Sequence, residues 1–553
     1  MNMPITDAEY KALEDIVGSE YITRDPSDLE AYCQCWGQVG AYGDKWSPTP
    51  AAVALPANTE EIQALVRVCN RLDIHFKPIA SGFENVCFAQ FDDRGLLLDL
   101  KRMNKIIEID VKNQHAIVEP YVSSWRLQRE AMKYGLTVGS IGVGPSGNVI
   151  AGACCHFGAG NCNVSMGGLG RNVLGVEWVM PEGTVYTMGS GEMGEDWFSA
   201  DGPGPSMRGV LRGRAGANGG HGVITKASVK LYPWYGPDKV TFTGDPNKGV
   251  RMKGVDPVPE NYKVWLVDCQ SRESQFKHLL EFGQADVAQM LCGAMIMPKT
   301  EGNDESVVMM DMATKMGLDF SRLSDEAVVM ITAAETKRGM EFRNKLVEHM
   351  IEKDELVNQP IDAHEAFAAL MWNFGYPIEA FRSSGDFLIS PTTEGSPEKL
   401  MHMRVHADEI ILKQMAKNRM KHVEVSEPFL VCNENGMAGF HMENCTGWDP
   451  YDEESVKAYQ EVAGEAQNVD SDFVHLGIPH LGAGLQIEWV HHVHETWGSY
   501  YNNYDYWLRE IKHAIDPNNA AEWSAYIPYR YDPKYHERVF WKGEWLDQER
   551  ERA

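Results

Sequence analysis

Apolar residues recur at helix and strand periods through the first part of the chain. Residues 58–72 predict a helix with Thr59 as its cap and acids in its first turn. The apolar residues on one face of this helix are Ile62, Leu65, Val66 and Cys69. Short apolar runs bounded by glycine, proline or polar residues predict strands at 51–55, 76–79, 95–100, 106–110, 116–119, 175–180, 185–188 and 223–231.

The pattern changes beyond residue 240, where strands alternate with amphipathic helices. Strands are predicted at 263–268, 290–297 and 328–333, and helices at 273–285 and 337–353. This alternation is typical of a second, α+β domain.

Residues 134–170 contain no Asp, Glu, Lys or Arg, and 11 of these 37 residues are glycine. The glycines, with the proline and asparagines among them, exclude a membrane helix, which needs about 20 predominantly apolar residues. We predict a long loop whose main chain packs closely against something large and flat or phosphorylated, because only glycine lets the backbone come so near.

Two shorter glycine segments lie beside predicted strands. Residues 80–85 follow the strand 76–79, and residues 213–222 precede the strand 223–231. A strand, a helix, a strand and a glycine turn in this order outline a phosphate-binding arrangement.

The composition narrows the class of protein. The 553 residues suffice for roughly two to four domains of about 100–200 residues. A net charge of −28 disfavours nucleic acid and anionic membrane surfaces as partners. The N-terminus shows no secretory signal, so we expect a cytoplasmic protein without membrane insertion. The 11 cysteines are too sparse for a disulfide framework, and we expect Cys33, Cys35, Cys154, Cys155 and Cys162 to be reduced and packed rather than bound to metal.

Four stretches, in this order, resemble the flavoproteins of the vanillyl-alcohol oxidase and p-cresol methylhydroxylase type, which include glycolate and D-lactate dehydrogenases. They read LPANTEEIQALVRVCNRLDIHFKPIASG, LLLDLKRMNKIIEID, NVLGVEWVMPEGTVYTMG and GANGGHGVITKASVKLYP. A further stretch, IKHAIDPNN at 511–519, resembles the last helix of that family.

The resemblance implies an α+β fold: a two-subdomain FAD-binding domain plus an α+β cap domain over the flavin. The expected limits are 1–238 for the FAD-binding domain, 239–499 for the cap or substrate domain, and 500–553 for the return of the chain to the FAD domain.

The same resemblance assigns the residues that hold FAD. The turn after the strand 76–79 resembles the pyrophosphate loop, the segment 145–152 the second FAD loop, and residues 222–224 the strand that meets the pyrimidine edge. The cofactor-binding residues are Ile79, Ala80, Ser81, Gly82, Phe83, Glu84, Asn85, Pro145, Ser146, Gly147, Asn148, Gly152, Gly222 and Ile224.

Some members of the family tether FAD through a histidine after the first loop or a cysteine in the second. Here Phe83 follows Gly82, and Val143 and Gly144 precede Pro145, so both tethers are absent at these positions. We expect noncovalent FAD, with a tether from the cap domain as the alternative. The tyrosine that phenol-oxidising members carry in the first loop is also missing.

Candidate catalytic residues gather late in the chain, where five of the 18 histidines fall within 475–494. A strand at 485–494 places His492 and Glu488 on one face, as a base with its orienting carboxylate, and His480 can be a second substrate ligand. A solvated or satisfied histidine cluster is the alternative. The string HLGIPHLGAG lacks the acidic and Asn members of the family's metal-binding segment, so no metal is expected. Arg382, near aromatic residues, can clamp a carboxylate or form a surface ion pair.

Three functions remain open. The first is hydride transfer between a small aromatic alcohol or phenolic substrate and flavin N5. The second is a 2-hydroxyacid dehydrogenase of the glycolate or lactate type that passes electrons to a protein partner. The third is a flavin-binding electron carrier without its own turnover. The resemblance also implies a homodimer.

Overall fold

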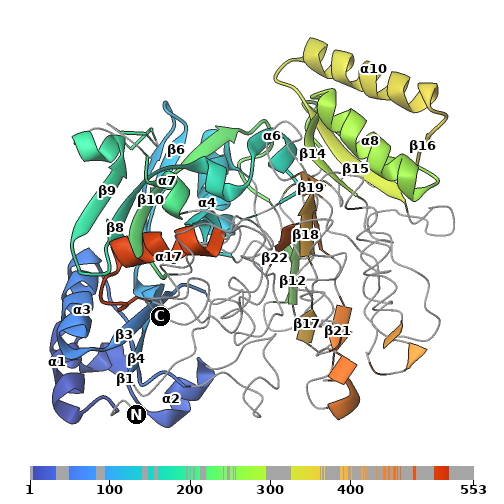
Figure 1. The fold of residues 1–553 in the computed structure, drawn as a ribbon. Helices are drawn as coiled ribbons and strands as arrows, with labels where there is room; N and C mark the ends of the chain where they lie inside the picture. Colours follow the sequence, from blue (N-terminus) through green and yellow to red (C-terminus); the bar gives the residue numbers. More distant parts are fainter. Residues whose placement is uncertain are drawn as a thin grey trace, which may run out of the picture.

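Strands form three larger sheets in a computed structural model of the chain (Figure 1). The structure describes residues 4–32, 49–81, 94–139, 147–154, 158, 160–194, 197–199, 201–202, 206–211, 219–240, 242–245, 249–252, 255, 257–293, 326–361, short stretches between 363 and 480, and 504–521.

The first sheet lies near the N-terminus and has the order β1-β2-β4-β3. The strands β2 (Ala52–Ala54), β4 (Gly95–Asp99) and β3 (His75–Ile79) run parallel, and β1 (Ile22–Thr23) is antiparallel to β2. The helices of this region are α1 (Asp7–Val17), α2 (Pro26–Ala31) and α3 (Thr59–Leu72). The helix α3 connects β2 to β3, and its predicted apolar face is fully buried against this sheet.

The cap of α3 differs from the prediction by one residue. The Oδ1 of Asn58 accepts the main-chain N–H of Glu61 at 2.8 Å, so Asn58 and not Thr59 is the N-cap. The Thr59 hydroxyl instead donates to Glu177 Oε1 at 2.6 Å. The Thr59 side chain, predicted to cap the helix, is therefore bonded to a residue far away in the sequence.

The second sheet has the order β5-β6-β10-β8-β9, with β7 paired to the end of β10. Its neighbouring strands are antiparallel. The short helix α4 (Ser124–Ala131) packs beside β7. The strands are β5 (Ile106–Asp110), β6 (His115–Val118), β7 (Leu136–Val138), β8 (Val173–Val179), β9 (Val185–Gly189) and β10 (Val223–Pro233).

The uncharged segment 134–170 is not one long loop, so that prediction was wrong in part. It contains β7, α5 (Val149–Cys154) and α6 (Asn163–Met166). Much of its described part is interior: α5 packs in the core of the second sheet, and Val164 of α6 packs in the core of the third. The Ser165 hydroxyl donates to the carbonyl of Gln289 at 2.6 Å, so this segment joins the two halves of the chain.

The third sheet belongs to the C-terminal half and has the order β16-β13-β15-β14-β19-β20-β18-β22. The helices α8 (Arg272–Gln284) and α10 (Lys337–Lys353) lie beside it at the upper right of Figure 1. Its strands are β13 (Tyr262–Asp268), β14 (Ala288–Gly293), β15 (Ala327–Ala333), β16 (Val357–Asn358), β18 (Thr392–Gly395), β19 (Val431–Cys432), β20 (Phe440–Glu443) and β22 (Ile478–His480). Two further pairs are β11 (Phe242–Asp245) with β12 (Gly249–Met252), and β17 (Phe387–Ile389) with β21 (Thr446–Trp448).

An aromatic core cluster joins the end of β10 to the third sheet. Trp234 follows β10 directly, and its ring lies 5.5 Å from that of Tyr262 and 5.9 Å from that of Phe367. Cys162 and Met371 belong to the same buried cluster. The predicted packing of Cys162 is thus confirmed, as it is for Cys154 in the second core; Cys33, Cys35 and Cys155 lie outside the described residues.

The helix α17 (Tyr504–Ile515) returns to the N-terminal sheets, where Figure 1 draws it in red. The Phe76 N–H in β3 donates to the carbonyl of Ala520 at 2.8 Å. The predicted last helix is present, but it ends at Ile515 rather than at residue 519, and the chain that follows it lies beside the first sheet. The domain limits 238 and 499 stay predictions. Among the described residues, every helix is too short or too polar to cross a bilayer.

Replacing Gly222 by alanine tests the loop before β10. Its φ is +109°, and a Cβ would lie 2.3 Å from the carbonyl oxygen of Val179, so we expect a cost of at least about 1–3 kcal/mol. Gly222→Ala should lower the urea midpoint of unfolding, measured by tryptophan fluorescence. The control is Gly209→Ala in α7 (Arg208–Leu211), where a Cβ meets nothing within 4 Å and the effect should stay below about 1 kcal/mol. Equal midpoints for the two variants would contradict this account.

Candidate functional site

A hydrogen bond joins the two segments that were predicted to hold FAD. The main-chain N–H of Ser81 donates to Asn148 Oδ1 at 2.7 Å. Asn148 is only 4% exposed, and its own backbone forms a bridge with Ser123. The adjacent Gly147 carbonyl accepts the Ser124 N–H at 2.8 Å. Asn148 is therefore held from both sides and fixes where the first loop begins.

The first loop leaves the sheet at the carboxyl end of β3. Ile79 is buried, Ala80 is half-buried and Ser81 is exposed, so the chain reaches the surface within three residues. The carboxyl ends of parallel strands are the usual place for ligands in open sheets, because loops and free main-chain groups converge there.

A third segment, residues 219–222, lies against the same strand. A Cβ on Gly219 would lie 2.6 Å from Pro78 Cδ, so only glycine lets this backbone come so close. The carbonyl of His221 accepts the indole N–H of Trp178 at 2.8 Å, which anchors the segment to β8. Three stretches far apart in the sequence thus meet around the end of β3.

The start of β10 keeps main-chain groups available at this place. Val223 and Ile224 pair with β8 on one side, whereas the register with β6 begins only at Ala227. Within the described strands, the other edge at Val223 and Ile224 has no partner. The Ile224 side chain is half-buried against the core of the second sheet, and the role of its main chain toward FAD stays a prediction.

The side chain of Lys512 in α17 holds the segment 219–222 in place. Its side chain is fully buried, and Nζ donates to the carbonyl of Gly220 at 2.5 Å, to Asp516 Oδ2 at 2.7 Å and to the carbonyl of Ala521 at 2.7 Å. A buried ammonium is tolerated when its N–H groups all find acceptors and one of these is charged. Lys512 was not predicted as a site residue, because helix periodicity does not reveal a partner almost 300 residues away.

His221 is a second residue of the site that sequence reasoning missed. Its ring is buried near the Val210 carbonyl, and neither ring nitrogen makes a hydrogen bond of ordinary geometry among the described residues. Burial and the nearby Lys512 ammonium lower the pKa of His221 to about 3, against the carbonyl of Val210, which favours the charged form. Its only signal was its position next to Gly222. Buried polar atoms without partners at such a place fit a site that a polar cofactor completes.

The described cofactor residues are distributed as follows. Ile79, Ala80, Ser81, Gly147 and Asn148 lie together at the junction of the two loops, while Gly222 and Ile224 lie at the start of β10. Gly152 lies within α5, and a Cβ there would meet Leu169 Cδ1 at 3.0 Å, so helix packing already accounts for this glycine. The others lie outside the described residues: Gly82, Phe83, Glu84, Asn85, Pro145 and Ser146.

The structure describes one of the four predicted catalytic residues, His480. His480 is the last residue of β22, the edge strand of the third sheet, where it pairs with Thr392. Arg382, Glu488 and His492 lie outside the described residues, as does the predicted strand 485–494. Their roles stay predictions.

Comparisons with known proteins agree with this geometry. Residues 50–189 match the family model described as FAD binding domain. The chain is 26% identical over 255 residues to D-2-hydroxyglutarate dehydrogenase of Xanthomonas citri pv. viticola, covering 45% of this chain and 50% of that protein. It is 30% identical over 198 residues to glycolate oxidase subunit GlcD of Bacillus subtilis, covering 34% and 38%. The chain thus spans half or less of the length of these relatives.

Solved structures match over almost the whole chain. Substrate-bound p-cresol methylhydroxylase superposes with a TM-score of 0.69 at 17% identity, covering 96% of this chain and 99% of that one. The 4-ethylphenol oxidase of Gulosibacter chungangensis gives a TM-score of 0.68 at 16% identity, covering 95% and 99%. Likeness at this identity establishes the fold.

The fold and the loop junction define a protein with an FAD-binding domain and a second α+β part, which confirms the predicted fold class. Residues 50–189 match an FAD binding domain, and the chain as a whole shares the fold of p-cresol methylhydroxylase and 4-ethylphenol oxidase.

Asn148→Ala tests the junction of the two loops. Removing Oδ1 leaves the Ser81 N–H without its acceptor, which costs about 1–3 kcal/mol, so FAD should bind about tenfold more weakly. Fluorescence titration of the apoprotein with FAD measures this. Asn104→Ala, at an exposed residue away from the junction, is the control and should bind FAD as the unmodified protein does. Unchanged affinity in Asn148→Ala, or an equal loss in both variants, would contradict the assignment.

Proposed function

We propose that this protein is an FAD-dependent oxidoreductase that transfers a hydride between a small substrate and the flavin. The hydrogen bond between Ser81 and Asn148 is the main support for the proposal. It joins the two predicted FAD loops, and both residues lie within the matched residues 50–189. When bound, the flavin supplies the hydride acceptor at N5.

The main chain of three loops would hold the cofactor. The N–H groups of 81–85 would bond phosphate oxygens without a lysine, and residues 145–148 would form the second wall. The unpaired edge at Val223 and Ile224 would donate to and accept from the ring edge of the cofactor. We propose noncovalent FAD, since Phe83, Val143 and Gly144 offer no side chain that could form a tether.

The substrate chemistry rests on residues late in the chain. In the proposed arrangement, His492 takes the proton from the substrate hydroxyl as hydride leaves, Glu488 orients the imidazole, and His480 and Arg382 hold the substrate. The sequence pattern supports the roles of these four residues.

We propose a small aromatic alcohol or phenol as the substrate class. The whole-chain fold likeness to p-cresol methylhydroxylase and 4-ethylphenol oxidase supports it. Aromatic residues support this substrate class further. The buried cluster with Trp234, Tyr262 and Phe367 includes Met371, and the sequence directly after Met371 contains Trp372, Phe374 and Tyr376.

A 2-hydroxyacid is the second candidate substrate. Its support comes from D-2-hydroxyglutarate dehydrogenase and the glycolate oxidase subunit among the relatives, and from Arg382, whose guanidinium suits a carboxylate. In that case electrons would pass to a protein partner. A flavin carrier without turnover is the third candidate. We further propose a homodimer, from the resemblance.

Anaerobic reduction of the flavin separates these functions. We expect p-cresol or 4-ethylphenol to bleach the visible flavin band, and His492→Gln to slow that step by at least about 100-fold, as for loss of a general base. Dithionite should reduce both proteins equally. His349→Gln, at an exposed histidine of α10, is the control and should behave as the unmodified protein.

Bleaching by D-2-hydroxyglutarate, glycolate or D-lactate, and by neither phenol, would overturn the aromatic assignment in favour of the hydroxyacid. Bleaching by dithionite alone would favour the carrier. Equal rates for His492→Gln and the unmodified protein would remove His492 from the mechanism.

A further inference from the structure

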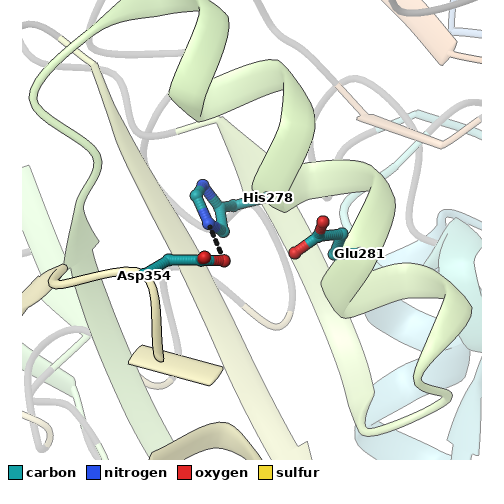
Figure 2. Close-up of side chains that lie close together, drawn as sticks. All are labelled: His278, Glu281 and Asp354. Atoms are coloured by element: carbon teal, nitrogen blue, oxygen red, sulfur yellow. Dashed lines mark hydrogen bonds and ion pairs between the residues drawn. The ribbon is translucent and has the colours of Figure 1, made fainter. Parts of the chain in front are cut away.

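Three side chains that can bind metal converge between α8 and the end of α10, away from the candidate FAD site. His278 and Glu281 lie three residues apart and so share one face of α8. Asp354 is the residue that ends α10. One ligand atom from each lies within 4.8 Å of the others, and Figure 2 shows the imidazole and the two carboxylates directed toward a common point.

The contacts of His278 allow Nε2 to act as a metal ligand. Nδ1 lies 2.7 Å from the Ser274 carbonyl, with the Ser274 hydroxyl at 3.1 Å, and Nε2 lies 3.0 Å from Asp354 Oδ2. A neutral imidazole has one N–H, so two tautomers fit these contacts. In one, Nε2 donates to Asp354 and Nδ1 accepts the Ser274 hydroxyl. In the other, Nδ1 donates to the Ser274 carbonyl and the Nε2 lone pair faces the carboxylates, with the ring side chain only 2% exposed.

A metal ion between Nε2 and the carboxylates selects the second tautomer. The hydrogen bond to Asp354 accounts for two of the three side chains without a metal, whereas a metal ion also uses Glu281 as a third ligand.

We propose that His278, Glu281 and Asp354 form a site for a divalent transition metal of the Zn²⁺ type. One nitrogen and two carboxylate oxygens, with water in the fourth position, suit Zn²⁺. The contact from Nδ1 to the Ser274 carbonyl is the outer contact that ligating histidines normally make, and it presents the Nε2 lone pair. A histidine ligand disfavours Mg²⁺ and Ca²⁺, which prefer oxygen. Two carboxylates and a neutral imidazole balance the charge of one divalent ion.

Lys277 competes for the same carboxylates. Its Nζ lies 3.0 Å from Asp354 Oδ2 and 3.7 Å from Glu281 Oε1, and its side chain is 49% exposed. Because a half-exposed lysine can turn into solvent, the metal would displace the ammonium from the site. The metal would then join α8 to the end of α10, which makes this a structural site independent of FAD.

Zn²⁺ binding to the full-length, flavin-containing protein tests the proposal. The protein is stripped with a chelator and titrated with Zn²⁺ against a chromophoric competitor, and Co²⁺ reports on ligation through its visible absorption. We expect His278→Gln to lose one equivalent of bound Zn²⁺, or to bind it at least about tenfold more weakly. His349→Gln, an exposed histidine on α10, is the matched control and should keep that equivalent.

Lys277→Gln gives a second, opposite expectation. Removal of the competing ammonium should tighten Zn²⁺ binding, and the gain should vanish when His278→Gln is added. The proposal is overturned if His278→Gln binds Zn²⁺ with unchanged stoichiometry and affinity, or if Lys277→Gln tightens binding equally with and without His278. It is also overturned if no Zn²⁺ binds this region, which leaves His278 as a hydrogen-bond partner of Asp354 only.

Discussion

The hydrogen bond from the Ser81 main chain to the Asn148 side chain is the contact on which the candidate FAD site depends. The loops that meet there carry almost no charge, so no ion pair can hold them. They need fixed partners instead. Asn148 is buried and held by the Ser123 bridge, and the segment with Gly220 is held by the buried ammonium of Lys512. The buried side chains of Asn148 and Lys512 thus fix the position of main-chain segments that contain few charged residues.

The route of the chain explains how one fold can hold both halves together. The uncharged segment 134–170 passes from the core of the second sheet to β14 of the third, and α17 returns to the first sheet. Charged side chains in its buried parts, β7, α5 and α6, would be desolvated, which agrees with the lack of charge there. The aromatic cluster with Trp234 adds a second buried contact between the halves.

Periodicity predicted the helices well, because α3 and α10 bury one face and show it in the sequence. Strands such as β4 and β15 are buried on both faces and were recognised as continuous apolar runs. It misjudged segments whose structure depends on distant partners. Thr59 bonds Glu177 and leaves the cap to Asn58, and α5 has no polar face because both sides are covered. Lys512, His221 and the His278 cluster were invisible for the same reason: their partners come from other elements. The loop glycines were found through resemblance, since a single glycine turn is a weak signal.

The visible absorption spectrum of the purified protein, repeated on the supernatant after acid precipitation, tests the central claim that these loops bind FAD without a covalent bond. We expect two flavin bands, roughly near 370 and 450 nm, and their release into the supernatant. Yellow colour that stays in the pellet would contradict the noncovalent assignment. A colourless protein that takes up no added FAD would contradict the site itself.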